Sequence, residues 1–172
     1  MKLSSGSVKA LSWGLHFSQV LLGTCYQEGN GVEKDLSAAL SWYRRGAEQG
    51  DPLAQVTLGS CYSMGTGVKK DYYEAIKWCR RAAEQEWGNA YTALGYFYYS
   101  GLGMKKDYDA AFRLFKKGAE KNDVNAFVWL GMCYEYGTGV YFKDRTKAAE
   151  WYRKAAEEGN EFAKESLQRL GY

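Results

Sequence analysis

The sequence has little proline or histidine and lacks long apolar stretches. Its 172 residues include one proline and one histidine. No stretch approaches the roughly 18 consecutive apolar residues of a membrane span. With 23 basic and 20 acidic residues, the net charge is +3, far from the strongly basic signature of nucleic-acid-binding proteins. A membrane-spanning protein is therefore not expected, and nucleic acid is not the expected partner.

Motifs for catalysis and phosphate binding are also absent. The chain has none of the S-x-x-K, S-D-N or K-T-G motifs of serine penicillin-recognising enzymes. It also lacks the G-x-x-x-x-G-K-[ST] phosphate loop. The sequence does not exclude a general acid–base pair of carboxylates, but each carboxylate is explained as a helix cap or a surface charge. We predict no catalytic residue, no cofactor and no enzyme activity.

Internal repetition dominates the sequence. A Leu-Gly pair recurs at positions 22–23, 58–59, 94–95 and 130–131, always 36 residues apart. A tyrosine follows three residues after each glycine, and a G-x-G element follows the tyrosine. A fixed period of this length is typical of small units that bury their apolar faces by stacking on one another. Function is then expected on a surface built by stacking.

Each repeat predicts a pair of helices. The G-x-G element ends the first helix, and an aspartate before the next apolar-periodic stretch is an N-cap signal for the second. The second helix carries alanine and aromatic residues at the i, i+3, i+4 spacing of one buried face. The single proline, Pro52, stands at a predicted first helical position. The four predicted N-caps are Asp35, Asp71, Asp107 and Asp144.

The shared positions read A-x-x-x-L-G-x-x-Y-x-x-G-x-G-V-x-x-D-x-x-x-A-x-x-W-Y/C/F-x-x-x-A-E. This string resembles the Sel-1-like repeat, a relative of the tetratricopeptide repeat with a longer loop between its helices. Residues 18–159 carry four consecutive copies. The resemblance implies an all-α, right-handed superhelix (solenoid) of antiparallel αα-hairpins. It also implies an adaptor or scaffold role toward other proteins, without a reaction.

The domain boundaries follow from the repeats. We expect a disordered segment over 1–7 and a single solenoid over 8–172, with helix over most of 8–27. The repeats are placed at about 16–50, 51–86, 87–122 and 123–159. A polar capping helix over 160–172 is expected to close the C-terminal end, because terminal repeats expose a face that internal repeats bury.

Three of the four cysteines occupy one repeat column, at Cys25, Cys61 and Cys133. On a helical wheel, this column lies beside the core leucine, where a small buried thiol fits. Some secreted relatives of the family carry a cysteine pair in each hairpin, but no such pair recurs here. A reducing, cytoplasmic compartment is therefore favoured. With only His16 available and no C-x-x-C, we predict no metal site.

The N-terminal region allows a rival interpretation as a lipoprotein signal ending at Cys25. We favour the repeat helix for two reasons. Polar residues, including Ser12, His16 and Gln19, interrupt the apolar stretch. The Leu-Gly-x-Cys-Tyr string also recurs at 58–62 and 130–134, where no signal could be cleaved.

The predicted binding surface is the concave wall formed by the first helices. With the core leucine at 0°, positions −5, −2, +2 and +5 point to the opposite side of the helix, and there the copies differ most. Tyrosine and methionine are frequent interface anchors, and paired asparagines can hold a peptide backbone. Alternatively, the two tyrosines only pack on each other and on the neighbouring helix. The predicted groove comprises Ser60, Ser63, Asn89, Thr92, Tyr96, Tyr99, Asn125, Val128, Met132 and Glu135.

A row of basic pairs on the second helices is the alternative site. It would lie on the convex face and could bind a polyanion, an anionic membrane or RNA. Each pair is followed by a glutamate at i+3 or i+4, which we expect to neutralise it partly. We therefore interpret the row as a solvated face, and a protein or peptide as the expected partner. The pairs are Arg44 and Arg45, Arg80 and Arg81, Lys116 and Lys117, and Arg153 and Lys154.

Overall fold

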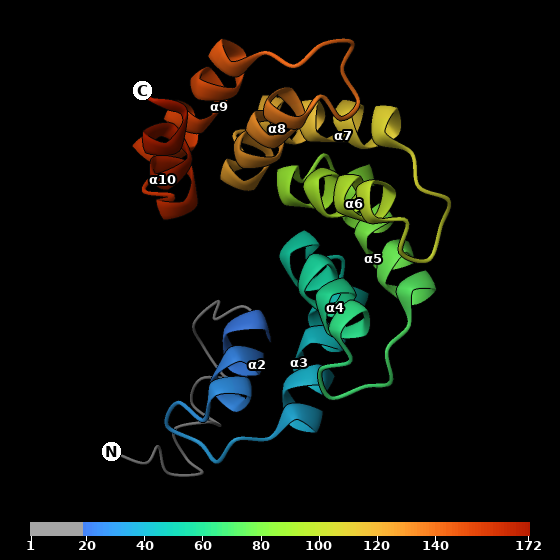
Figure 1. Cartoon of the computed structure of the whole chain (residues 1–172). Coiled ribbons are helices and arrows are strands. Elements are labelled where there is room, and N and C mark those ends of the chain that lie inside the picture. The colour runs from blue at the N-terminus through green and yellow to red at the C-terminus, as the bar shows by residue number, and fades with distance from the viewer. Residues whose placement is uncertain (1–18) are drawn as a thin grey trace. The chain divides into compact units, whose positions relative to one another are not determined.

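The computed structural model describes residues 19–172, and this part of the chain is built of helices and loops without a strand (Figure 1). The expected disorder of 1–7 and the start of the helix expected over 8–27 lie outside the described residues. The described helices are α2 (Gln19–Glu28), α3 (Leu36–Glu48), α4 (Pro52–Met64), α5 (Tyr72–Glu84), α6 (Gly88–Ser100), α7 (Tyr108–Glu120), α8 (Val124–Tyr136), α9 (Arg145–Glu157) and α10 (Glu161–Leu170).

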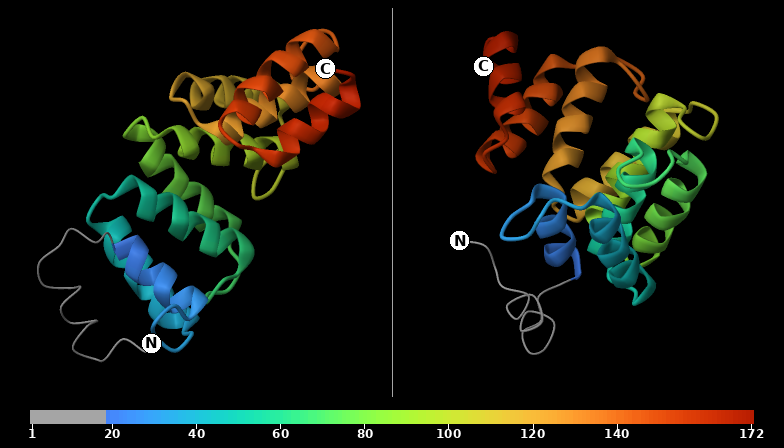
Figure 2. Two further views of the ribbon diagram at one scale, coloured as in Figure 1. Left: turned by 90° about the vertical axis from the view of Figure 1, so that its left-hand side faces the viewer. Right: turned by 90° about the horizontal axis from the view of Figure 1, so that it is seen from below.

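The chain divides into two compact units, Met1–Ala82 and Ala83–Tyr172, here called unit 1 and unit 2. In unit 1, α3 packs against both α2 and α4. In unit 2, α6 packs on α7 and α8 on α9, while α7 also contacts α8 and α9 contacts α10. The views of Figure 2 show α9 and α10, in orange and red, side by side. The expected αα-hairpin is therefore present in the first, third and fourth repeats, and in the second repeat Gly59 of α4 lies against Ala75 and Cys79 of α5.

A glycine on the first helix of each pair accommodates a side chain from the second helix. A Cβ added at Gly131 of α8 would lie 2.5 Å from the Tyr152 ring of α9, and a Cβ added at Gly95 would lie 2.5 Å from the Phe115 ring. These distances are too short for any real contact. Tyr152 and Phe115 are both fully buried, so the recurring glycine is required for the two helices to pack closely.

The G-x-G elements end the first helices as predicted. In the fourth repeat, Gly137 adopts a left-handed φ of 74° and Gly139 a φ of 71°. A side chain at Gly139 would also collide with the carbonyl oxygen of Tyr108 at the start of α7. Asp144 closes the loop, because its N–H donates to the Tyr134 carbonyl at 2.9 Å.

The predicted N-caps are confirmed at all four aspartates. Asp35 accepts backbone N–H groups from Ser37 and Ala38, and Asp71 accepts them from Tyr73 and Glu74. The carboxylates of Asp107 and Asp144 accept N–H groups in the same way. Pro52 opens α4, as expected from its position in the sequence.

The four cysteines are free thiols. Cys61, Cys79 and Cys133 are buried, and burial raises the pKa of Cys61 to about 11 and that of Cys79 to about 12. A thiol with so high a pKa stays protonated at neutral pH and behaves as a small apolar group. The expectation of a small buried thiol beside the core leucine is confirmed for Cys61 and Cys133.

Residues 19–172 contain no helix that is long and apolar enough to cross a bilayer. Within the same residues, no group of three or more histidine, cysteine, aspartate or glutamate side chains could hold a metal ion.

Substitution Gly131→Ala tests the packing of the pairs. We expect the free energy of unfolding to fall by about 1–3 kcal/mol because the new methyl group collides with the Tyr152 ring. Urea denaturation would measure the change. Glu150→Ala, at an exposed position of α9, should change it by less than about 0.5 kcal/mol. Alanine has the better helix propensity by about 1 kcal/mol, so a stabilised Gly131→Ala protein would contradict the packing account.

Candidate functional site

The groove residues predicted in unit 2 lie on α6 and α8, which contact each other. Asn89, Tyr96 and Asn125 are exposed, and Tyr99, Val128, Met132 and Glu135 are partly buried. Ser60 and Ser63 lie on α4 of unit 1, where the Ser63 hydroxyl donates to the Ser60 carbonyl at 3.0 Å.

Thr92 does not face solvent, so this part of the prediction is wrong. Only 5% of the residue is exposed. The space beside Gly118 of α7 is filled by the Thr92 hydroxyl oxygen and by the Ala126 side chain of α8. The helical wheel assumed one buried direction, but α6 is covered by its own partner helix and by the following pair. Position −2 therefore lies between α7 and α8.

Trp129 lies against both tyrosines of the predicted groove, although it was not predicted as a site residue from the sequence. Its ring lies 5.7 Å from Tyr96 and 5.1 Å from Tyr99, and it stacks on Phe115 at 5.2 Å with an interplanar angle of 7°. Tyr99 also packs edge-on against Tyr108 at 5.1 Å. The two tyrosines do pack on the neighbouring helix, as the alternative interpretation expected. Tyr96 nevertheless keeps 41% of its surface exposed.

Asn89 and Asn125 occupy the same repeat position near the starts of α6 and α8. Both are exposed, and neither side chain forms a hydrogen bond or ion pair within the described part of the chain. Each amide offers two donor hydrogens and one acceptor oxygen. The two side chains are therefore available to a ligand.

Glu135 is already engaged within the protein, which corrects its assignment to an open groove. Its side chain is only 7% exposed. The Tyr152 hydroxyl of α9 donates to its carboxylate at 2.8 Å. The Arg169 guanidinium of α10 donates to both of its oxygens, at 3.1 Å for one of the two bonds. Glu135 therefore connects three helices of unit 2.

This network changes the titration of its members. The hydrogen bonds from Arg169, and then from Tyr152, hold the pKa of Glu135 below its ordinary value. Burial and the neighbouring Glu135 carboxylate raise the pKa of Tyr152. The carboxylate is therefore charged and the phenol protonated at neutral pH.

The first repeat carries an equivalent arrangement. The Tyr43 hydroxyl donates to the Gln27 side-chain oxygen at 3.2 Å. Gln27 and Glu135 stand at the same repeat position, as do Tyr43 and Tyr152. In the other two repeats, Cys79 and Phe115 replace the tyrosine, and neither has a hydroxyl group that needs a hydrogen-bond acceptor. The residue at position +5 of the first helix therefore depends partly on whether the second helix supplies a tyrosine. This correlation could have been found in the sequence.

The basic pairs cover aromatic rings. Arg45 lies over Trp42 at 5.5 Å, Arg81 over Trp78 at 4.5 Å and Lys154 over Trp151 at 4.3 Å. In the third repeat, where Leu114 replaces the tryptophan, Lys117 instead lies 5.5 Å over Tyr91 of α6. The second cation of each pair therefore has a role in packing.

No ion pair within residues 19–172 joins a basic pair to the glutamate that follows it. The ion pairs among residues 19–172 join other groups, such as Lys77 with Glu74 and Lys121 with Glu86. The first cations of the pairs, at 44, 80, 116 and 153, are exposed. Arg44 donates to the Tyr62 hydroxyl at 2.9 Å, and Arg153 lies over the Tyr172 ring at 6.0 Å.

The repeat pattern and the helix pairs agree with the comparison to known families. A sequence profile of the Sel1 repeat matches residues 16–51, 52–86, 88–123 and 128–160. The chain belongs to the Sel1 repeat family. Sel1 repeat proteins have an all-α solenoid fold, as predicted, and are generally non-catalytic scaffolds for protein–protein interaction.

Solved Sel1 structures resemble the chain. A Sel1 repeat protein from Oxalobacter formigenes has 37% identity and a TM-score of 0.85, over 96% of this chain and 68% of that protein. A protective antigen of uropathogenic Escherichia coli has 37% identity and a TM-score of 0.76 over 91% of this chain. The match spans only 33% of the antigen.

The cysteine-rich protein B of Helicobacter pylori is 29% identical, with a TM-score of 0.58 over 78% of this chain and 96% of that protein. No curated protein matched in a comparison of sequences.

Substitution Glu135→Gln tests the link between α8, α9 and α10. At pH 7 we expect the free energy of unfolding to fall by about 1–3 kcal/mol because the charged hydrogen bonds are lost. The lowered pKa of Glu135 stabilises the fold above its unfolded value of about 4.3. That contribution disappears as the pH falls through the lower folded value.

Urea denaturation at a series of pH values would therefore show the wild type and Glu135→Gln converging in acid. Glu150→Gln, at an exposed position of α9, is the matched control and should track the wild type. A constant difference between wild type and Glu135→Gln from pH 7 to pH 3 would refute the ionic role.

Substitutions at the adjacent Arg80 and Arg81 distinguish a role in packing from a role in anion binding. Arg81→Gln should lower the free energy of unfolding by about 0.5–1 kcal/mol because it uncovers Trp78. Arg80→Gln, on the same helix and also exposed, should have no measurable effect. Thermal denaturation measures both. Wild-type binding of polyuridylate that salt and either substitution abolish would instead favour the anion-binding interpretation.

Proposed function

We propose that unit 2 binds an extended segment of a partner protein across α6 and α8. The surface comprises Asn89, Tyr96, Tyr99, Asn125, Val128 and Met132, and is called the α6–α8 face below. This face contains the predicted groove residues of unit 2 except two. Thr92 is omitted because it is buried, and Glu135 because it holds Tyr152 and Arg169.

The exposed ring of Tyr96 is the observation that carries the proposal. One side of the ring contacts Trp129, while 41% of the residue remains in water. A partially exposed tyrosine gains further burial when a partner covers it, and tyrosine is a frequent interface anchor. Its contact with Trp129 also limits the side-chain freedom that binding would otherwise cost.

Tyr99 and Trp129 form a rigid support beneath this anchor. Tyr99 is held between Trp129 and Tyr108, and Trp129 in turn stacks on the buried Phe115. A ligand would therefore meet an ordered aromatic surface. Val128 and Met132, which pack partly against the core of unit 2, extend the apolar surface along α8.

The two asparagines favour a peptide ligand over a small apolar molecule. Asn89 and Asn125 are one repeat apart, on neighbouring helices of one unit. Their free amides can each donate to and accept from a main-chain amide group. The six residues carry no formal charge, so the proposed ligand segment is an extended peptide with uncharged, apolar side chains.

Selection of binding peptides from a displayed random library would test the proposal. Affinities of the selected peptides for the wild type and for Tyr96→Ala would be measured by fluorescence anisotropy. We expect Tyr96→Ala to weaken binding about ten-fold, because loss of an interface anchor typically costs more than about 1 kcal/mol. Asn89→Ala combined with Asn125→Ala should also weaken it.

Tyr73→Ala is the matched control, since Tyr73 is a 74% exposed tyrosine on α5 of unit 1. This variant should bind as the wild type does. Circular dichroism would verify that every variant keeps its helices. Peptides that bind all variants equally would show that the α6–α8 face is not the binding surface.

A further inference from the structure

The fourth repeat carries an aromatic loop where the other repeats carry charge. Between the second glycine and the capping aspartate, the first three copies read Val-Glu-Lys, Val-Lys-Lys and Met-Lys-Lys. The fourth reads Val-Tyr-Phe-Lys and is one residue longer. Tyr141 is 99% exposed and Phe142 is 82% exposed. Packing within the described chain accounts for neither side chain.

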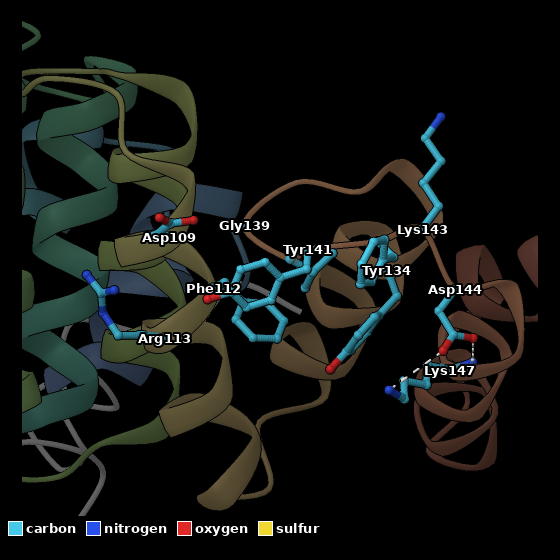
Figure 3. Close-up of a pocket in the computed structure, with 11 residues that line it drawn as sticks. Asp109, Phe112, Arg113, Tyr134, Gly139, Tyr141, Lys143, Asp144 and Lys147 are labelled. Carbon is cyan, nitrogen blue, oxygen red and sulfur yellow. Dashed lines mark hydrogen bonds and ion pairs between the residues drawn. The ribbon is translucent and has the colours of Figure 1, made fainter.

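A cavity of about 570 Å³ lies beside this loop. It is bounded by α7, the end of α8, the loop and the first turn of α9 (Figure 3). In its wall, the Phe112 and Tyr134 rings meet edge to face, with centroids 5.6 Å apart. The volume is in the range of sites that take small organic ligands or single side chains. All of its residues belong to unit 2.

The charges around the cavity favour an anionic group. Three cations, Arg113, Lys143 and Lys147, stand against two carboxylates, Asp109 and Asp144. Asp144 already interacts with Lys147. Its carboxylate accepts the Lys147 backbone N–H at 2.9 Å and lies 3.6 Å from the Lys147 ammonium. Asp109 stands in the first turn of α7, where the helix dipole favours a negative charge.

Neither Arg113 nor Lys143 forms an ion pair within residues 19–172. Two cations without an ion pair, against the single carboxylate of Asp109, therefore border a cavity whose wall is partly aromatic. A ligand complementary to both features has a bulky apolar group with a carboxylate close by.

We propose that this cavity is a second docking site, for a partner peptide in which a bulky aromatic or aliphatic side chain is flanked by aspartate or glutamate. The apolar side chain lies against Phe112 and Tyr134. Tyr141 and Phe142 lose their exposure by covering it, and Arg113 and Lys143 interact with the flanking carboxylates. The site shares no residue with the α6–α8 face, so the two can be tested separately.

Two labelled peptides of opposite charge would test this proposal on the full chain. The probes are fluorescein-labelled, C-terminally amidated Asp-Asp-Trp-Asp-Asp and Lys-Lys-Trp-Lys-Lys, with binding followed by fluorescence anisotropy. We expect the acidic peptide to bind at least about ten-fold more tightly. The double variant Tyr141→Ser, Phe142→Ser should weaken it about ten-fold. Arg113→Glu should reduce the preference for the acidic peptide.

Tyr73→Ser and Tyr96→Ala are the controls, and both should bind the acidic peptide as the wild type does. Because Tyr141 and Phe142 are exposed, the double variant should keep the wild-type circular dichroism and melting temperature. Equal binding of the two peptides, or unchanged binding by the double variant, would overturn the proposal. So would wild-type binding to phosphatidylserine vesicles that the double variant loses, because the loop would then be a membrane contact.

Discussion

The close approach of a second-helix side chain to a first-helix glycine is the contact on which each pair depends. The Tyr152 ring occupies the space that a side chain at Gly131 would need, and Phe115 does the same at Gly95. Any larger residue at these glycines would push the helices apart. The buried leucine beside each glycine, such as Leu130, would then lose its own packing. The recurrence of glycine at this position is thus a consequence of helix packing.

The same contact also constrains the surface. When the inserted side chain is a tyrosine, its hydroxyl reaches the end of the first helix and needs an acceptor there. Gln27 supplies one for Tyr43, and Glu135 supplies one for Tyr152. Residues that vary between repeats can therefore serve the interior. Variation alone does not distinguish a partner site from an internal partner, and exposure and hydrogen bonding are needed to separate them.

Much of the fold could be predicted from the sequence because its determinants are local and repeated. The helix ends follow from capping aspartates and from turn glycines with left-handed φ. The burial of Thr92 and the central role of Trp129 depend on contacts between successive pairs. A wheel drawn for a single helix does not contain those contacts. Likewise, the length of the 137–144 loop is visible in the sequence, but the cavity beside it depends on α7 and α9.

The indole signals of the protein offer the most direct test of binding at the α6–α8 face. The chain has six tryptophans, and Trp129→Phe would assign the Trp129 indole signal in a ¹H–¹⁵N correlation spectrum. A peptide selected for binding should shift this signal, since Trp129 contacts both Tyr96 and Tyr99. Movement of the Trp42, Trp78 or Trp151 signals, with Trp129 unchanged, would contradict the account and direct attention to the basic pairs.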